Sequence, residues 1–240
     1  TSLTGWQDAM NALGWNDYEI DKNNPKNPIV EETEGRKNQK ELLKELRKTA
    51  HKAAEEYAHS LGQNPPKLVT TVKPEGTQTQ MPTVSSGLHF NHSPYYVRRV
   101  RINATDPLAK VCEELEYPVY PEVGQDPDNP QTKVIEFPVK APEGRTKFDV
   151  SALEQLENYK MFMQHYVDHN ASATIHVRDQ EWEDVEEWLW HNWEYVVGLT
   201  FLSLSDNFYE LMPYEAISKE KYEQRAEDMK TFQPSLVNKY

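Results

Sequence analysis

Cysteine is nearly absent from this chain: Cys112 is the single cysteine in 240 residues. One cysteine excludes an intrachain disulfide, a CxxC redox pair and a zinc site built from several thiolates. Long hydrophobic runs are also missing, since no apolar stretch approaches the roughly 20 residues that cross a bilayer. The first residues, TSLTGWQDAM, lack the charged and apolar regions of a secretory signal. We therefore expect a cytoplasmic protein with no membrane partner.

Positive charge is scarce as well. Lys and Arg number 26 against 39 Asp and Glu, which leaves a formal net charge of −13. Because acidic surfaces are repelled by nucleic acid and by anionic membranes, we expect no nucleic-acid partner. Aromatic residues make up 11% of the chain and supply large contact surfaces for a core. A length of 240 residues then suits one domain covering 1–240.

Helical and extended patterns alternate along the chain. Apolar spacing and capping residues predict helices at 3–15, 38–62, 106–117, 151–168, 181–196 and 219–232. Strands are predicted at 67–72, 132–142, 171–177 and 198–204, where β-branched or alternating residues gather. Polar, proline-containing segments predict an exposed loop at 17–37 and another loop at 118–131, and Pro138 places its strand at an edge or beside a bulge. This alternation favours an α/β fold with parallel strands joined by helical crossovers.

Residues 73–101, KPEGTQTQMPTVSSGLHFNHSPYYVRRVR, concentrate groups that can bind phosphate. A predicted strand ends at a turn around Gly76, and ligands of α/β proteins bind at such strand ends. Glycine lets the backbone approach an anion, and the threonine hydroxyls add donors. The alternative is an ordinary polar loop, because the same residue types are common in turns and the spacing GxxxxGK[ST] is absent. Arg98, Arg99 and Arg101 either contact a ligand or pair with carboxylates from a strand or helix.

Three stretches together resemble one family. They are SLTGWQDAMNALGW, KPEGTQTQMPTVSSGLHFNHSPYYVRRVRI and YVDHNASATIHVRDQEWEDVEEWLWHNWEYVVGLTFLS, in this order along the chain. They resemble the C-terminal part of the class II, adenosylcobalamin-dependent ribonucleotide reductases, in particular the monomeric, triphosphate-reducing kind. The resemblance covers nearly the whole chain.

The resemblance implies a fold and a binding site. The fold would be the C-terminal portion of the ten-stranded α/β barrel of ribonucleotide reductases, with flanking helices. Segments 67–72 and 171–177 would be barrel strands. The loop that holds the phosphates of the ribonucleotide substrate would consist of Pro74, Glu75, Gly76, Thr77, Gln78 and Thr79.

The resemblance also implies an activity, the reduction of ribonucleoside triphosphates by thiyl-radical chemistry with adenosylcobalamin as cofactor. The cysteines and the glutamate that this chemistry needs would lie outside this sequence, so we expect no catalytic residue here. We expect instead a partner chain that carries the N-terminal half of the barrel and the finger-loop cysteines. A dithiol reductant such as thioredoxin would act through that partner. The alternative is a non-catalytic nucleotide-binding or scaffold remnant of the same fold.

Two other residue sets have structural interpretations. Cys112 lies on an apolar helical stripe and is expected to pack in a core. His165 and His169 are four residues apart on a predicted helix, but no third ligand is evident, so we expect no metal site.

The segment 181–196 is rich in tryptophan. The residues expected on its core-facing side are Trp182, Val185, Leu189, Trp193 and Val196. Trp188 and Trp190 fall off that face and are expected to contact another element.

Overall fold

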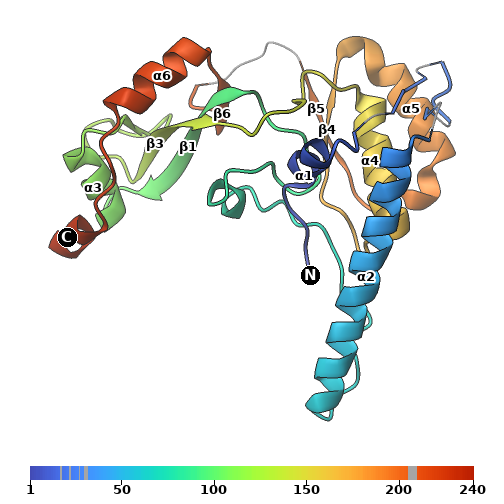
Figure 1. Ribbon diagram of the computed structural model, residues 1–240. Coiled ribbons are helices and arrows are strands. Elements are labelled where there is room, and N and C mark those ends of the chain that lie inside the picture. The colour runs from blue at the N-terminus through green and yellow to red at the C-terminus, as the bar shows by residue number, and fades with distance from the viewer. Residues whose placement is uncertain (17, 22, 27, 30–31, 205–209) are drawn as a thin grey trace. The chain divides into compact units, whose positions relative to one another are not determined.

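The computed structural model describes residues 1–16, 18–21, 23–26, 28–29, 32–204 and 210–240. The chain divides into two compact units (Figure 1). Unit 1 comprises Thr1–Asn91 and Pro142–Ser205, and unit 2 comprises His92–Ala141 and Asp206–Tyr240. A single domain over 1–240 stays a prediction, because two compact units can belong to one domain.

The described residues of unit 1 form four α-helices and a small parallel sheet. The helices are α1 (Trp6–Leu13), α2 (Glu34–Ser60), α4 (Ala152–His165) and α5 (Trp182–His191), with short 3₁₀ turns η1 (Gln78–Gln80), η2 (Asp179–Glu181) and η3 (Trp193–Tyr195). Strands β4 (Thr174–Val177) and β5 (Thr200–Ser203) pair in parallel, with α5 between them in sequence. The predicted helical crossover between parallel strands is thus confirmed for this pair.

The core of unit 1 is built around α4. Its side chains Leu156, Tyr159 and Phe162 are fully buried and pack in one cluster with Ile175 of β4 and Trp188 of α5. In Figure 1, α4 and α5 lie on the same side of the β4–β5 pair. A helix surrounded on most sides in this way holds the adjacent strands in place, because a close-packed interior permits few other arrangements.

The predicted strand at 67–72 is only partly correct. Thr71 and Val72 form isolated parallel bridges with Ser2 and Ala171, but no longer strand forms there. Leu68 is 57% exposed, so the first half of the segment is not a buried strand. The β-branched composition indicated an extended backbone, but only its last two residues form β-bridges with neighbouring segments, while Val69 and Thr70 make other hydrogen bonds with Thr1 and Asp168.

The predicted exposed loop at 17–37 is wrong at its end. Helix α2 begins at Glu34, because the Thr33 side chain caps it by accepting from the amide of Arg36 at 3.3 Å. The Arg36 side chain is among the most deeply buried of the protein, at 1% exposure. Positions 17, 22, 27, 30 and 31 lie outside the described residues.

Unit 2 is an antiparallel sheet with helices. Its strands are β1 (Tyr95–Asn103), β2 (Val119–Pro121), β3 (Thr132–Lys140) and β6 (Tyr214–Ala216), in the order β2-β3-β1-β6. Its helices are α3 (Pro107–Glu114) and α6 (Lys219–Asp228), followed by η4 (Pro234–Lys239). All three strand pairings are antiparallel, so the expected parallel connectivity is wrong for this unit. The loop predicted at 118–131 is also wrong where β2 forms.

Two predictions for unit 2 are confirmed. Cys112 is 4% exposed and packs in a core cluster with Val111 and Ile135. Pro138 lies on β3 beyond the end of β2, since β2 pairs only as far as Ile135. The amide of Glu136 donates to the carbonyl of Pro118 on the β2 side, so the imide nitrogen of Pro138, two residues further, points to the same unpaired edge.

Helix α2 is the longest helix in the described part of the chain, yet it is strongly polar. None of the helices described is both long and apolar enough to cross a membrane.

Candidate functional site

The predicted phosphate loop, residues 74–79, lies in unit 1 directly after the bridge at Val72. Glu75, and not Gly76, takes the left-handed backbone conformation, with φ of 49°. The loop then enters the 3₁₀ turn η1, in which the amide of Thr79 donates to the carbonyl of Glu75 at 3.1 Å. Thr79 is buried, whereas Thr77 and Gln78 are exposed. The structure therefore brings these residues together in one tight turn.

The first amides of this turn have no hydrogen-bond acceptor within the described residues, and we call them open amides. Among the residues that the structure describes, the amides of Gly76, Thr77 and Gln78 donate no hydrogen bond. The amides of Gln80 and Met81, by contrast, bond to carbonyls within the turn at 3.2 Å each. Open amides at the start of a helical turn are the donors that an anion can accept from. This geometry suits the predicted phosphate loop, although residues 74–79 remain a prediction as a binding site.

Three hydrogen bonds link the loop to β4. The amide of Thr174 donates to His89 Nε2 at 2.9 Å, and His89 Nδ1 lies 2.8 Å from the carbonyl oxygen of Ser86. The Ser86 hydroxyl in turn donates to the carbonyl of Pro74. Because Nε2 accepts, the imidazole is neutral with its proton on Nδ1, and burial lowers the pKa of His89 in agreement with this. We call these contacts the Thr174–His89–Ser86–Pro74 relay.

Helix α1 holds the other side of the same segment. The Asp8 carboxylate accepts from the amide of Ser85 at 2.6 Å and from Asn91 Nδ2 at 2.5 Å. Gly87 has a φ of 53°, and a Cβ there would lie 3.0 Å from Val72 Cγ1, so a side chain is not tolerated. Sequence reasoning missed the roles of Asp8 and His89, because both depend on partners more than 75 residues away.

The three arginines belong to a different site, on β1 of unit 2. Arg99 is 8% exposed and pairs with Glu136 at 2.6 Å and with Glu215. Arg101 pairs with Glu122. These contacts support the alternative that the arginines bind carboxylates within a strand, and they overturn the idea that all of 73–101 serves one phosphate site.

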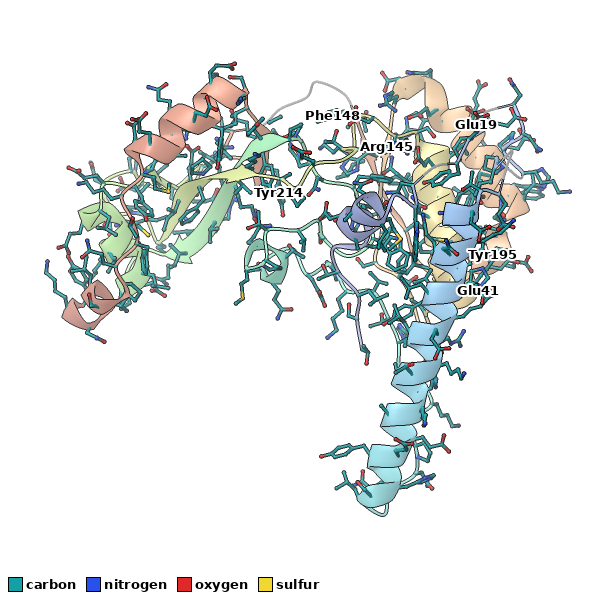
Figure 2. The ribbon with its side chains drawn as sticks, in the orientation of Figure 1. Glu19, Glu41, Arg145, Phe148, Tyr195 and Tyr214 are labelled. Atoms are coloured by element: carbon teal, nitrogen blue, oxygen red, sulfur yellow. The ribbon has the colours of Figure 1, made fainter. Side chains whose placement is uncertain are left out.

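Arg98 has partners of another kind. Its guanidinium lies 4.5 Å from the centre of the Tyr214 ring (Figure 2) and donates to the carbonyl of Pro213 at 3.1 Å. The three arginine side chains therefore all have partners inside the sheet of unit 2.

A small cavity lies beside β4 in unit 1. Its volume is about 20 Å³, and its polar lining consists of His89, Lys147, Gln155, Asn158, Thr174 and His176. Burial lowers the pKa of Lys147 to about 8. It also lowers the pKa of His176 to about 4, with a further contribution from the nearby Lys147 and His89. Sequence reasoning did not find this cluster, because its members come from segments far apart in the chain.

The described part of the chain contains no candidate metal centre. No three histidine, cysteine, aspartate or glutamate side chains gather there as a metal site would require.

A wider, open pocket of about 430 Å³ on α2 and α4 is lined by Lys44, Arg47, Lys48, His51, Gln164 and His165. Two of these side chains already have a partner, because Arg47 and His51 each lie 2.6 Å from the buried carboxylate of Asp168.

The tryptophan assignments need correction. Trp188, expected off the core face, is fully buried and donates from Nε1 to Glu157 at 2.8 Å. Trp193, expected in the core, is 69% exposed. The reason is that α5 ends at His191, so the helical spacing does not continue to Trp193. Trp190 lies off the core face as expected and is 82% exposed.

Comparison with known proteins points to one group of enzymes. No protein-family model matches the chain. It is 31% identical over 191 residues to the adenosylcobalamin-dependent ribonucleoside-triphosphate reductase of Lactobacillus acidophilus, which covers 78% of this chain and 25% of that protein. The reductase of the same name from Lactobacillus delbrueckii subsp. bulgaricus is 29% identical over 194 residues, covering 78% of this chain and 26% of that one.

A solved structure agrees with these relatives. The crystal structure of a B12-dependent, class II ribonucleotide reductase matches with a TM-score of 0.78 and 25% identity, over 99% of this chain and 34% of that chain. The α/β fold class is thereby confirmed. The chain spans about a quarter of the length of the curated relatives that it matches.

Proposed function

We propose that this chain supplies the C-terminal part of a class II, adenosylcobalamin-dependent ribonucleotide reductase, because it is homologous to a part of these enzymes. In the complete reductase, ribonucleoside triphosphates would be reduced to deoxyribonucleoside triphosphates. Strands β4 and β5, with the bridge of Val72 to Ala171, would contribute to the barrel. Residues 74–79 would bind the phosphates of the substrate.

The observation that carries this proposal is the set of open amides at Gly76, Thr77 and Gln78. Phosphate oxygens accept strong hydrogen bonds from backbone amides that converge at the start of a helical turn. The Thr174–His89–Ser86–Pro74 relay holds the turn, so its donors are oriented before a ligand arrives. Pre-orientation raises affinity, because less conformational freedom is lost on binding.

The reducing chemistry is not assigned to this chain. Cys112 is its only cysteine, and burial together with the nearby Glu113 raises the pKa of the thiol. A thiol with a raised pKa is a poor nucleophile, and its burial keeps it away from a substrate in solution. The reactive cysteines would lie in the remaining part of the reductase, on a partner chain that also receives electrons from a dithiol such as thioredoxin.

The cofactor is proposed only for the complete reductase. The relatives are named for adenosylcobalamin, but the cavity beside β4 in unit 1 measures about 20 Å³, far too little for a corrin ring. We therefore assign no residue of this chain to the cofactor. A cytoplasmic location remains a prediction.

Reconstitution tests the activity. This chain is mixed in equal amounts with a chain that carries the remaining part of the reductase, and with adenosylcobalamin, a ribonucleoside triphosphate and a dithiol. We expect deoxyribonucleotide, measured by chromatography. If a folded one-to-one complex yields no product, the chain is better described as a non-catalytic remnant.

The phosphate loop is tested separately by two variants in the same complex. Gly76→Val places a branched side chain over the open amides, and Thr77→Ala removes a donor. We expect each to weaken nucleotide binding about tenfold, the equivalent of one hydrogen bond to a charged group. Thr49→Ala, at an exposed position of α2, is the control. Equal affinities for all of these proteins would remove residues 74–79 from the proposal.

A further inference from the structure

The small cavity beside β4 contains a cation without an opposite charge. A volume of about 20 Å³ admits roughly one water-sized atom. The cavity is bounded by three parts of unit 1, the segment 88–90, helix α4 and strand β4. Lys147 and His176 face it together.

Most of the other polar groups in this cavity already have partners. Both ring nitrogens of His89 are used in the relay. The Gln155 amide bonds twice to the backbone of His176, donating at 3.1 Å and accepting at 2.9 Å. Asn158 accepts from Arg36 at 2.6 Å and donates to the Tyr18 hydroxyl at 3.2 Å. These groups form the walls of the cavity and leave little capacity for a ligand.

The Lys147 ammonium differs from them. Its one contact within the described part of the chain is with the neighbouring Phe148 ring, 5.1 Å from the ring centre (Phe148 is labelled in Figure 2). Burial alone accounts for its lowered pKa, and no carboxylate offsets it. Desolvating an ammonium without a counter-charge is costly, and proteins rarely retain such a group without a partner.

Two other cations of unit 1 have hydrogen-bond partners within the protein. Arg36 donates to Asn158 and to the carbonyl of Glu157. Arg145, labelled in Figure 2, forms two hydrogen bonds of 2.6 Å with the Glu154 carboxylate. Among the described residues no carboxylate offsets the charge of Lys147, so a ligand could supply the opposite charge.

We propose that Lys147 and His176 bind one oxygen of a phosphate-type oxyanion at the mouth of this cavity. The cavity admits a single oxygen, so the rest of the anion stays outside it. Lys147 supplies the charge and the neutral His176 ring supplies one N–H donor. This site shares no residue with the loop 74–79, and it does not depend on the proposed reductase function.

Acylation of the lysine tests the proposal on the full 240-residue chain. The chain is treated with acetic anhydride at pH 8, with and without inorganic phosphate, and Lys147 modification is measured by peptide mass spectrometry. An anion that raises the lysine pKa by about one unit lowers its unprotonated fraction at pH 8 roughly fivefold. We expect phosphate to slow Lys147 acylation by that factor and to leave Lys52, 74% exposed on α2, unaffected. An unchanged rate at Lys147 overturns the proposal.

Variants and other anions sharpen this test. Phosphate should shift the NMR signals of the His176 ring in the wild type and in Lys147→Arg, which keeps the charge, but not in Lys147→Met. A shift of equal size in Lys147→Met would show that the lysine does not bind the anion. Acetate at the same concentration should give no protection, and equal protection by acetate would overturn the phosphate assignment.

The loop variant separates the two sites. Gly76→Val should leave the protection of Lys147 by phosphate intact, even where it weakens nucleotide binding in the reductase complex. If Gly76→Val abolishes the protection, the anion is bound by the loop and the proposal for Lys147 is wrong.

Discussion

Two neighbouring segments of the sequence, 74–89 and 95–103, both contain groups that can bind an anion, but the structure leaves these groups unpaired in the first segment and pairs them in the second. The first has few charged side chains, yet the amides of Gly76, Thr77 and Gln78 in its turn donate no hydrogen bond within the described structure. The second has three arginines, yet each has a partner within its own sheet. The comparison teaches that the number of positive charges in a segment does not by itself indicate an anion site, because the structure can pair those charges with its own groups.

The strand register explains the second outcome. In the antiparallel pair of β1 and β3, Arg99 lies directly opposite Glu136. Side chains that face each other across two strands are close enough to interact. Arg225 of α6 adds a second guanidinium to the same carboxylate at 2.6 Å.

The largest effect is expected from Glu136→Ala, which tests whether the arginines serve the sheet. The substitution removes the buried carboxylate partner of Arg99 and leaves it only the half-exposed Glu215 among the described carboxylates, and breaking such a buried pair costs about 3–5 kcal/mol of unfolding free energy. Chemical denaturation of the chain measures it. Glu122→Ala is the matched control and should cost much less, because its partner Arg101 is 36% exposed. Similar losses for both variants would contradict the structural role of the Arg99 pair.

His89→Phe tests the relay of the first segment. It leaves the Thr174 amide and the Ser86 carbonyl without this partner, which should cost about 1–3 kcal/mol. Because burial lowers the pKa of His89 below its ordinary 6.5, the neutral ring stabilises the fold above pH 6.5, and this contribution is lost as the pH falls through the lowered value.

The pH dependence provides the decisive readout for this variant. Unfolding free energies between about pH 5 and pH 8 should fall less steeply toward acid for His89→Phe than for the wild type. The neighbouring Lys147 titrates in both proteins and serves as a common background, whereas His176 loses the contribution of His89 to its lowered pKa, which changes the slope in the same direction. Identical slopes for the two proteins would show that His89 does not act as the neutral acceptor.

Ser86→Ala should have a smaller effect. It removes the last hydrogen bond of the relay, worth about 1 kcal/mol, and frees the Pro74 carbonyl. Hydrogen exchange should then become faster at the amides of Thr79 and Gln80. The control is Ser60→Ala, since Ser60 donates to the carbonyl of Tyr57 at the exposed end of α2. Unchanged exchange in Ser86→Ala would show that the relay does not hold the loop.

The smallest effect is expected from Arg101→Gln. If the arginines serve the sheet alone, this substitution should change nucleotide binding in the reductase complex less than about twofold, below 0.5 kcal/mol. Isothermal titration calorimetry measures the affinity. A tenfold loss of nucleotide affinity would contradict this distinction between the two segments and would show that Arg101 contributes to phosphate binding.

Local features of the chain explain the successful predictions. The helices at α2, α3 and α4 follow apolar spacing, and each begins after a capping side chain, Thr33, Asp106 and Ser151. The predictions failed where an element is short or where the partner of a residue lies far away in the sequence. Strand β2 has only three residues, and the helical spacing around Trp193 did not reveal that α5 ends at His191.

The sequence by itself determined the existence of most helices and of the longer extended segments, and the position of the turn at 74–79, because spacing, capping and turn chemistry act over a few residues. Only the tertiary structure decided which donors are committed. Arg99 meets Glu136 across 37 residues, and His89 meets Thr174 across 85. Such pairs depend on strand register and on the path of the whole chain, so the free amides of the loop and the unpaired ammonium of Lys147 become evident only after folding.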